Sequence, residues 1–317
     1  MTTPLILLLE PFPEKMLAQV ATLHPQCNIV DARAPEIRQR LLKDAVITYG
    51  MPALEILPAA GRLRWIQLIY AGVPQDLCPL AKERGLTVTN MAGLYGPSIA
   101  EHAIAMMLLL SRNLHIVQRN QAERNWDRTV MASMRDVHGK TLALVGLGNI
   151  GQNIALLAKA HGMRVLGCRR TQRITPYVDR QFPTNEMAAM VCQADYVAVA
   201  APLTRHTEGL LGPKEFAAMK PGAIYINVSR GAVAQEKALL EALHSGHIAA
   251  AGLDVFAVEP LPAGHPFWSM PQVLVSPHFS GERVNQSSLP AERFVRNLAS
   301  WFAGKELEGQ VNLDFGY

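Results

Sequence analysis

The sequence has few cysteines and no long apolar run, and both features bear on the cellular compartment that it suits. Only four of the 317 residues are cysteine, and they are scattered along the chain at Cys27, Cys78, Cys168 and Cys192. Without a C-x-x-C pair they indicate reduced thiols and argue against a disulfide framework or a zinc site. The longest apolar stretch, residues 103–110, is far too short to cross a bilayer. Residues 1–10 hold one apolar run with no basic residue before it, which predicts a first strand and no signal peptide. We therefore expect a cytoplasmic protein with no membrane association.

Charged residues are also scarce, at 18% of the chain, and the formal net charge is only +4. There is no dense Lys/Arg block and no basic stripe with interleaved aromatic residues, so nothing in the sequence supports nucleic-acid binding. No H-E-x-x-H or comparable cluster predicts a catalytic metal. A hydrophobic fraction of 49% is typical of compact domains, and 317 residues are enough for two of them.

The first hundred residues alternate between strand-like and helix-like segments. Short apolar runs of strand length lie at residues 5–9, 28–30, 45–48, 65–69 and 87–90. Segments with helical spacing lie at residues 14–23, 35–42 and 52–60. This alternation predicts a parallel sheet covered by helices. Ser98 and Glu101 then have the spacing of a capping box, which predicts the start of an apolar helix that continues through residue 114. A helix so apolar on every side must be buried between domains or subunits.

A second alternating series begins at residue 140. Its strand candidates are 141–145, 164–168, 196–200, 223–228, 249–253 and 273–276. Helical segments are expected at 150–160, 214–219 and 236–244, and a final helix at 290–302. Six strands with crossover helices predict a doubly wound dinucleotide-binding sheet. The sequence therefore indicates two α/β domains.

The most informative motif follows the first strand of this second series. Gly146-Leu147-Gly148-Asn149-Ile150-Gly151 is a G-x-G-x-x-G turn that comes directly after an apolar strand and opens a helix. Gly146 permits the tight turn, Gly148 lets backbone N–H groups approach a pyrophosphate, and Gly151 lets the helix pack closely on the strand. The helix N-terminus adds free N–H donors and a partial positive charge. A glycine-rich turn without a ligand is the alternative, and the strand–turn–helix context argues against it.

The end of the next strand, about 20 residues on, selects between NAD and NADP, because an acidic residue there binds the ribose diol of NAD. This chain has Gly167-Cys168-Arg169-Arg170 and no carboxylate at that point. Arginine binds phosphate in a bidentate manner and stacks on adenine, so Arg169 and Arg170 favour NADP(H), with NAD(H) left open. The alternative is that both arginines only solvate a loop.

Three later segments each place one ionisable residue just past a predicted strand: Arg230, Glu259 and His278. Ligands of an open α/β sheet gather at the carboxyl ends of its strands, so these side chains are expected to converge beside a bound nicotinamide. Arg230 suits the anchoring of a substrate carboxylate and the polarisation of its carbonyl group. His278 suits proton donation near neutral pH. Glu259 suits the orientation of the imidazole and the stabilisation of its protonated form. Taken singly, each residue also has an ordinary structural explanation.

These motifs together resemble those of the D-isomer-specific 2-hydroxyacid dehydrogenase family, over essentially the whole chain. The resemblance is carried by Ser98–His102, His138–Gly151, the Pro202–Thr204 segment with Thr207, Asn227–Gly231, Gly252–Pro260 and Ser276–His278. It implies a Rossmann-type cofactor domain, residues 99–285, inserted into a flavodoxin-like substrate domain made of residues 1–98 and 286–317. It also implies an active site between the domains and a homodimer built largely around the cofactor domain.

The resemblance further implies a site residue by residue. Arg230, Glu259 and His278 would form the catalytic triad. Ala71, Gly72 and Val73, together with Arg230, would bind the substrate carboxylate. Asp254 would hold the nicotinamide carboxamide. The complete set of implied cofactor-binding residues is Gly146, Gly148, Asn149, Ile150, Gly151, Arg169, Arg170, Pro202, Thr207, Val228, Ser229 and Asp254.

The implied activity is reduction of small 2-keto acids such as glyoxylate or hydroxypyruvate to D-2-hydroxy acids by hydride transfer from NADPH. Arg169 stands where many members carry an acidic residue, which favours the NADP-using glyoxylate/hydroxypyruvate reductase branch. Pro74 departs from the polar residue that many members carry there, so the substrate preference stays open. Two alternatives also stay open: a formate- or phosphite-type dehydrogenase of the same family, and a cofactor-sensing scaffold similar to the related transcriptional corepressors.

Overall fold

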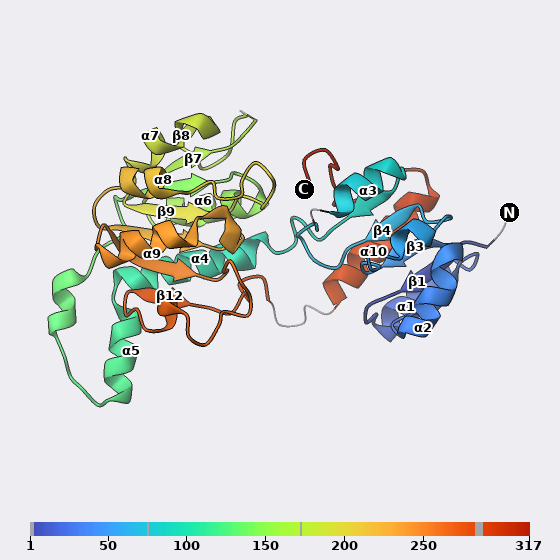
Figure 1. Cartoon of the computed structure of the whole chain (residues 1–317), viewed down its shortest axis with the longest axis horizontal. Helices are drawn as coiled ribbons and strands as arrows, with labels where there is room; N and C mark the ends of the chain where they lie inside the picture. Colours follow the sequence, from blue (N-terminus) through green and yellow to red (C-terminus); the bar gives the residue numbers. More distant parts are fainter. Residues whose placement is uncertain (1–2, 75, 172, 283–287) are drawn as a thin grey trace. The chain divides into compact units, whose positions relative to one another are not determined.

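The computed structural model describes residues 3–74, 76–171, 173–282 and 288–317. The chain divides into two compact units: unit 1 comprises Met1–Leu94 and Arg283–Tyr317, and unit 2 comprises Tyr95–Glu282. Unit 2 therefore interrupts the sequence of unit 1, and each unit has its own sheet (Figure 1). Of the two boundaries predicted from the sequence, the one between residues 285 and 286 lies outside the described residues. The one between residues 98 and 99 falls in the first turn of helix α4 (Gly96–Ser111).

Unit 1 is built on five parallel strands in the order β2-β1-β3-β4-β5. This is the flavodoxin-like order, as predicted. The strands are β1 (Leu5–Leu8), β2 (Asn28–Asp31), β3 (Ala45–Tyr49), β4 (Trp65–Gln67) and β5 (Thr87–Thr89). The helices are α1 (Glu14–Leu23), α2 (Pro35–Leu41), α3 (Leu77–Glu83) and α10 (Leu289–Phe302), with short 3-10 helices η1 (Leu42–Asp44) and η2 (Leu57–Ala59).

Helices cover both faces of the unit 1 sheet. Successive residues of a strand point to opposite faces, so neighbouring residues of β1 pack against different helices. Ile6 of β1 packs in one buried cluster with Val20 of α1 and Phe294 of α10. Leu7 packs in another, together with Leu77 of α3. A strand buried on both faces needs a nearly continuous apolar run, which explains why these strands are recognisable in the sequence.

Unit 2 contains seven parallel strands in the order β12-β11-β10-β9-β6-β7-β8. They are β6 (Thr141–Val145), β7 (Arg164–Cys168), β8 (Arg180–Phe182), β9 (Tyr196–Val199), β10 (Ala223–Asn227), β11 (Ile248–Leu253) and β12 (Val273–Val275). Numbered from β6, this is the doubly wound dinucleotide-binding order with one further strand beyond β11. The predicted fold class, two doubly wound parallel-sheet domains, is confirmed.

The helices of unit 2 are α4, α5 (Leu114–Ala122), α6 (Asn149–Ala160), α7 (Met187–Val191), α8 (Pro213–Ala218) and α9 (Glu236–His244). The 3-10 helices are η3 (Thr129–Ser133), η4 (Thr184–Glu186), η5 (Gly231–Val233) and η6 (Pro266–Trp268). Helix α5 and residues 123–134, which we call the arm, extend away from the layered body of unit 2 (Figure 1). Within the described ranges, no helix is long and apolar enough to span a membrane.

Several local predictions were wrong. Residues 52–60 form only the 3-10 helix η2, because Pro58 lies in that segment and cannot supply the N–H of a helix interior. The Ser98–Glu101 capping box is not the helix start, since α4 begins at Gly96 and contains Pro97 in its first turn, where proline is tolerated. The predicted helix does not run to residue 114, because Asn113 adopts a φ of 53° and separates α4 from α5.

Candidate active site

The turn between β6 and α6 fits a dinucleotide phosphate group. Gly146 has a φ of +99°, and a Cβ there would lie only 2.6 Å from the backbone nitrogen of Ala201. A Cβ at Gly151 would overlap the carbonyl oxygen of Gly146, so the helix can approach the strand only with glycine at this point. Gly148, by contrast, would meet no heavy atom within 4 Å. The turn is therefore tightly packed on its protein side and open at Gly148, the N-cap of α6, where N–H donors are available to an anion.

Asn149 and Ile150 form the first turn of α6 as predicted, and the Asn149 carboxamide packs against the start of α4. A Cβ added at Gly96 would overlap the Asn149 side chain, and the backbone oxygen of Asn149 accepts a hydrogen bond from Asn153 at 2.8 Å. The position of α6 is thus determined by α4 as well as by the sheet.

Arg169 and Arg170 follow β7 directly, at the carboxyl end of the strand next to β6. Arg169 is half-buried, and its Nη1 lies 3.4 Å from the Oγ1 atom of Thr175. Arg170 is exposed. Burial raises the pKa of the Cys168 thiol to about 11, so the residue before the two arginines carries no charge at neutral pH. The last residues of β7 and the two that follow therefore offer positive charge and no carboxylate.

Pro202 and Thr207 lie in a turn after β9 that is closed by its own hydrogen bonds. The Thr207 hydroxyl donates to the backbone oxygen of Pro202 at 2.6 Å and accepts from the backbone N–H of Thr204 at 2.7 Å. Thr207 thus determines the shape of this turn. Its predicted contact with a cofactor stays a prediction.

Arg230 is the third residue after β10 and is held by the segment that precedes it. The Asn227 side chain accepts from the backbone N–H of Ser229 at 3.0 Å and donates to the backbone oxygen of Arg230 at 3.2 Å. Val228 and Ser229 are almost fully buried, whereas Arg230 is only half-buried. The Arg230 Nη1 donates to the backbone oxygen of Ser229 at 2.6 Å. Its other guanidinium nitrogens remain suited to a carboxylate ligand.

Gly231 brings the loop after β10 against the loop after β11. A Cβ at this position would overlap the carbonyl carbon of Phe256, so no other residue permits the same approach. The backbone N–H of Phe256 in turn donates to Oε1 of Glu259 at 2.9 Å. The contact between the two loops therefore places Arg230 close to Glu259.

Glu259 and His278 are directly paired. Oε2 of Glu259 lies 2.6 Å from Nδ1 of His278, while Oε1 is occupied by the Phe256 N–H. Their side chains are 36% and 41% exposed, so both remain accessible to a ligand. Burial lowers the pKa of the Arg230 guanidinium, and the nearby Glu259 carboxylate acts in the opposite direction. An arginine stays protonated in either case. The three predicted catalytic side chains thus come from the ends of three neighbouring strands and gather around Glu259.

Asp254, which the resemblance assigns to a nicotinamide carboxamide, has no exposed surface in the structure. Its Oδ1 accepts from the Ser276 hydroxyl and, at 3.1 Å, from the backbone N–H of Phe279. Its Oδ2 accepts from the backbone N–H of Ser280 at 3.1 Å. The observed contacts are therefore with the loop that carries His278, and the implied contact with the cofactor stays a prediction.

The residues predicted to bind a substrate carboxylate, Ala71, Gly72 and Val73, belong to unit 1. They follow β4 and are half-buried. The side chain of Asn90 donates to the backbone oxygen of Ala71 at 2.7 Å, and the backbone N–H of Met91 donates to the oxygen of Tyr70 at 3.0 Å. This loop is thus tied to the segment after β5, at the carboxyl ends of the unit 1 strands.

One contact beside the predicted catalytic residues was missed at the sequence level. His102 was assigned no partner, yet its Nε2 lies 3.0 Å from Oγ of Ser276, a residue 174 positions away. The only available signal was the location of His102 inside the S-x-x-E-H segment, and that segment does not reveal which strand it packs against.

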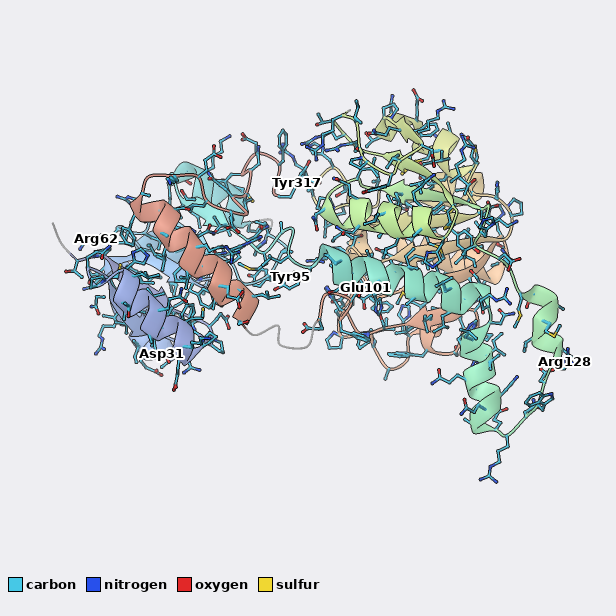
Figure 2. The ribbon with its side chains drawn as sticks, turned by 180° about the vertical axis from the view of Figure 1, so that it is seen from behind. Asp31, Arg62, Tyr95, Glu101, Arg128 and Tyr317 are labelled. Atoms are coloured by element: carbon cyan, nitrogen blue, oxygen red, sulfur yellow. The ribbon has the colours of Figure 1, made fainter. Side chains whose placement is uncertain are left out.

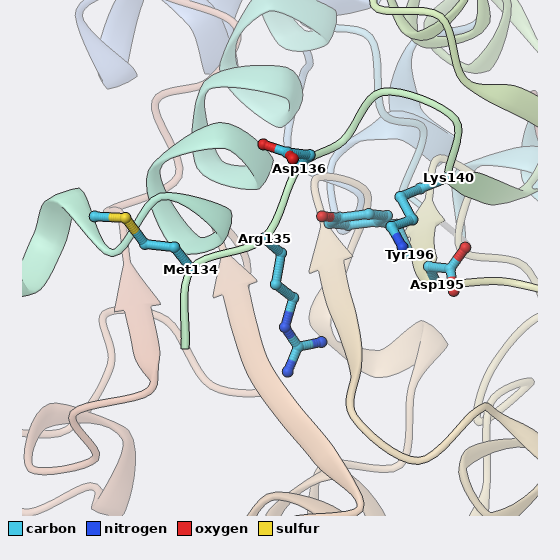
Figure 3. A pocket seen from close by; sticks show the side chains of 6 residues that line it. All are labelled: Met134, Arg135, Asp136, Lys140, Asp195 and Tyr196. Atoms are coloured by element: carbon cyan, nitrogen blue, oxygen red, sulfur yellow. The ribbon is translucent and has the colours of Figure 1, made fainter. Parts of the chain in front are cut away.

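A separate pocket lies at the opposite ends of the strands. It is lined by Met134, Arg135, Asp136, Lys140, Asp195 and Tyr196 (Figure 3). Lys140 precedes β6 and Tyr196 begins β9, so this pocket is at the amino ends of the strands, away from the residues above. Asp195 there is paired with Lys220 at 2.9 Å and accepts from the backbone N–H of Thr141. Both oxygens of the Asp195 carboxylate are thus engaged in structural contacts. Among the described residues, no group of three or more His, Cys, Asp or Glu side chains could hold a metal ion.

Known proteins resemble this chain over both units. Residues 104–280, more than half of the chain, match the family model described as D-isomer specific 2-hydroxyacid dehydrogenase, NAD binding domain. A glyoxylate reductase from Korarchaeum cryptofilum is 29% identical over 319 residues, which cover 98% of this chain and 96% of that protein.

Solved structures agree. A D-isomer specific 2-hydroxyacid dehydrogenase family protein from Aeromonas salmonicida is 33% identical, with a TM-score of 0.84 over 98% of this chain and 100% of the other. A D-isomer specific 2-hydroxyacid dehydrogenase from Xanthobacter autotrophicus, in complex with NADPH and MES, is 28% identical, with a TM-score of 0.83 and full coverage of both chains. With its parallel sheets, its glycine-rich turn and the paired Glu259 and His278, this chain belongs to the D-isomer specific 2-hydroxyacid dehydrogenase family.

Proposed function

We propose that the protein reduces small 2-keto acids, such as glyoxylate or hydroxypyruvate, to D-2-hydroxy acids with NADPH as the reductant. The observation that carries the proposal is the 2.6 Å pair of Glu259 and His278, with Arg230 beside it at the ends of neighbouring strands. These groups are what the reaction needs from a protein: a proton donor, a carboxylate that orients it, and a cation for a carboxylate substrate. The glyoxylate reductase relative supports the choice of substrate class.

His278 is proposed as the proton donor. Its Nδ1 is engaged by Glu259, so Nε2 is the atom available to a substrate. Protonated at both nitrogens, the imidazole donates its Nε2 proton to the oxygen of the keto group, while Glu259 keeps the ring oriented through Nδ1. The glycine turn would hold the pyrophosphate of NADPH, and the cofactor, when bound, would supply the hydride for the carbonyl carbon. The neutral imidazole then regains a proton from solvent.

Arg230 is proposed to bind the substrate carboxylate. Its guanidinium is half-buried, and a charge-assisted hydrogen bond gains strength when water is partly excluded. The same cation polarises the keto oxygen and so favours the negative charge that develops there on hydride transfer.

Steady-state assays of the purified protein test this function. With NADPH we expect turnover of glyoxylate, hydroxypyruvate or a related short 2-keto acid, and with NADH a lower kcat/KM for the same substrate. Formate and phosphite, assayed as donors with NADP⁺ and NAD⁺, cover the other reactions of the family. Turnover of formate or phosphite without keto-acid reduction would contradict the proposal, and so would the absence of all four activities.

Replacing His278 with Gln tests the proton donor. The amide cannot supply the proton, so kcat should fall by about 100- to 10,000-fold, whereas the affinity for NADPH, measured by fluorescence titration, should be retained. His244→Gln is the matched control, because His244 only hydrogen bonds within helix α9 and should keep full activity. An unchanged kcat in the His278 variant would remove this residue from the chemistry.

Replacing Arg169 with Asp and Arg170 with Ala tests the choice of cofactor. The change removes the positive charge at the end of β7 and introduces an acidic residue there, so the ratio of kcat/KM for NADPH to that for NADH should fall by about 10- to 100-fold. Arg164→Ala, at the amino end of the same strand, is the control and should leave the ratio unchanged. A wild-type protein that already prefers NADH would contradict the proposal that Arg169 and Arg170 select the 2′-phosphate of NADPH.

We also propose that the protein forms a homodimer through the arm. Four large apolar side chains of the arm are exposed: Leu114, Val117, Trp126 and Met131, with Trp126 exposed to 92%. Figure 2 shows Arg128 on this arm, outside the layered body of unit 2. Apolar side chains gathered on a projecting segment are typical of protein–protein contacts, and most homo-oligomers are symmetric dimers.

The dimer is tested by light scattering coupled to size-exclusion chromatography. The wild type should have twice the mass of one chain, and the double variant Val117→Glu with Met131→Glu should shift to the monomer, because charge is costly in an apolar interface. Leu23→Glu, on an exposed face of unit 1, is the control and should remain dimeric. A monomeric wild type would contradict the proposal.

A further inference from the structure

His102, on helix α4, contacts residues on both sides of His278. Its Nε2 lies 3.0 Å from Oγ of Ser276, two residues before His278. Its ring also meets the ring of Phe279, the next residue after His278, edge to face, with centroids 5.2 Å apart and an interplanar angle of 78°. One side chain of a well-packed helix therefore touches the His278 loop at two points.

The hydrogen bonds of this cluster run in one direction. The Ser276 hydroxyl has a single proton, which it donates to Oδ1 of Asp254. The short contact between His102 and Ser276 then requires that Nε2 of His102 donates and the Ser276 oxygen accepts. Burial lowers the pKa of His102, although Asp254, 3.8 Å from Nε2, acts in the opposite direction. The geometry thus assigns a proton to Nε2 of His102.

The loop that this cluster holds has a backbone conformation that needs support. His278 has a φ of 51°, in the left-handed region that residues other than glycine rarely adopt. Such a conformation persists only where the surrounding structure over-determines it. Asp254 accepts from Ser276, Phe279 and Ser280, on either side of His278, and has no exposed surface through which water could compete. His102 in turn orients the Ser276 hydroxyl toward Asp254.

We propose that His102 is a positioning residue for His278: by donating to Ser276 it holds the Ser276–Asp254 hydrogen bond, and with it the loop that presents the His278 imidazole to Glu259. This proposal rests on the function proposed above. A histidine that merely filled space between α4 and the loop would be replaceable by another ring. A histidine that orients Ser276 as a hydrogen-bond donor cannot be replaced by a ring without an N–H group.

Two substitutions separate these roles. His102→Phe keeps a ring against Phe279 but removes the donor, so kcat for the keto acid should fall by about 10- to 100-fold while the KM values for keto acid and NADPH change little. His102→Gln places an amide donor near the position of Nε2 and should recover most of the lost kcat. His161→Phe is the matched control, because His161 hydrogen bonds only to the backbone of its own helix and should keep wild-type kcat. Wild-type kcat in His102→Phe, or equal losses in the Phe and Gln variants, would overturn the proposal.

A double-mutant cycle tests whether His102 acts through Ser276. Ser276→Ala removes the acceptor of the His102 proton, so adding His102→Phe to it should produce no further loss of kcat. Losses that multiply in the double variant would mean that His102 acts by another route and would overturn the proposal. Thermal unfolding of each variant identifies any that fail to fold. If His102→Phe fails to fold, His102→Gln replaces it in the cycle. The His102→Gln variant should then have a kcat close to that of the wild type. The double variant His102→Gln with Ser276→Ala should have the same kcat as Ser276→Ala alone.

A readout that needs no catalysis is the ¹⁵N NMR spectrum of the histidine-labelled protein, in which the two neutral tautomers have different nitrogen shifts. The resonances of His102, identified by their loss in His102→Gln, should show the proton on Nε2 at neutral pH. Absence of a proton from Nε2 would overturn the proposal. A wild type that reduces no keto acid but shows the Nε2 tautomer would contradict the proposed function and leave the contact with Ser276 established.

Discussion

The close approach of Gly231 to Phe256 is the constraint on which the arrangement of the site depends. No side chain fits between these two backbones, so the loop after β10 lies directly on the loop after β11. The N–H of Phe256 then holds Glu259, and the other oxygen of Glu259 holds His278. Three loops from three neighbouring strands are in this way connected through backbone contact and two hydrogen bonds. A single added methyl group at Gly231 would act on all of them at once.

The carboxylates of Asp254 and Glu259 both lie near His278, but they differ in burial and therefore in role. Asp254 is fully buried and accepts hydrogen bonds from the His278 loop, so it stabilises a backbone conformation. Glu259 is partly exposed and binds the imidazole itself, so its negative charge acts directly on the protonated form of the ring. A buried carboxylate must have its hydrogen bonds satisfied, and a nearby loop can supply them as well as a ligand. Two carboxylates five positions apart thus have different roles because their environments differ.

Much of the fold could be predicted because parallel strands buried on both faces require apolar runs, and most such runs were recognisable. The elements that escaped prediction are those without that signature. Strand β8 has three residues at the edge of its sheet and includes the exposed Arg180. Residues 52–60 have helical spacing, yet their prolines limit them to a 3-10 turn. The start of α4 was misplaced by three residues, since the predicted N-cap is Ser98 and the observed one is Tyr95. A chance S-x-x-E match resembles a cap whether or not the helix begins there.

The sequence by itself determined the type of chemistry: a glycine turn between a strand and a helix, two arginines after the next strand, and an arginine, a glutamate and a histidine that each follow a strand. It could do so because the carboxyl ends of parallel strands meet at one edge, whatever the details of packing. Only the tertiary structure decided which atoms pair. Nδ1 of His278 with Glu259, Asp254 with the His278 loop, and His102 with Ser276 join residues 19 to 174 positions apart, at distances set by how helices and loops pack. Hydrogen bonds depend on separations of a few tenths of an ångström, and no periodicity in a sequence specifies those.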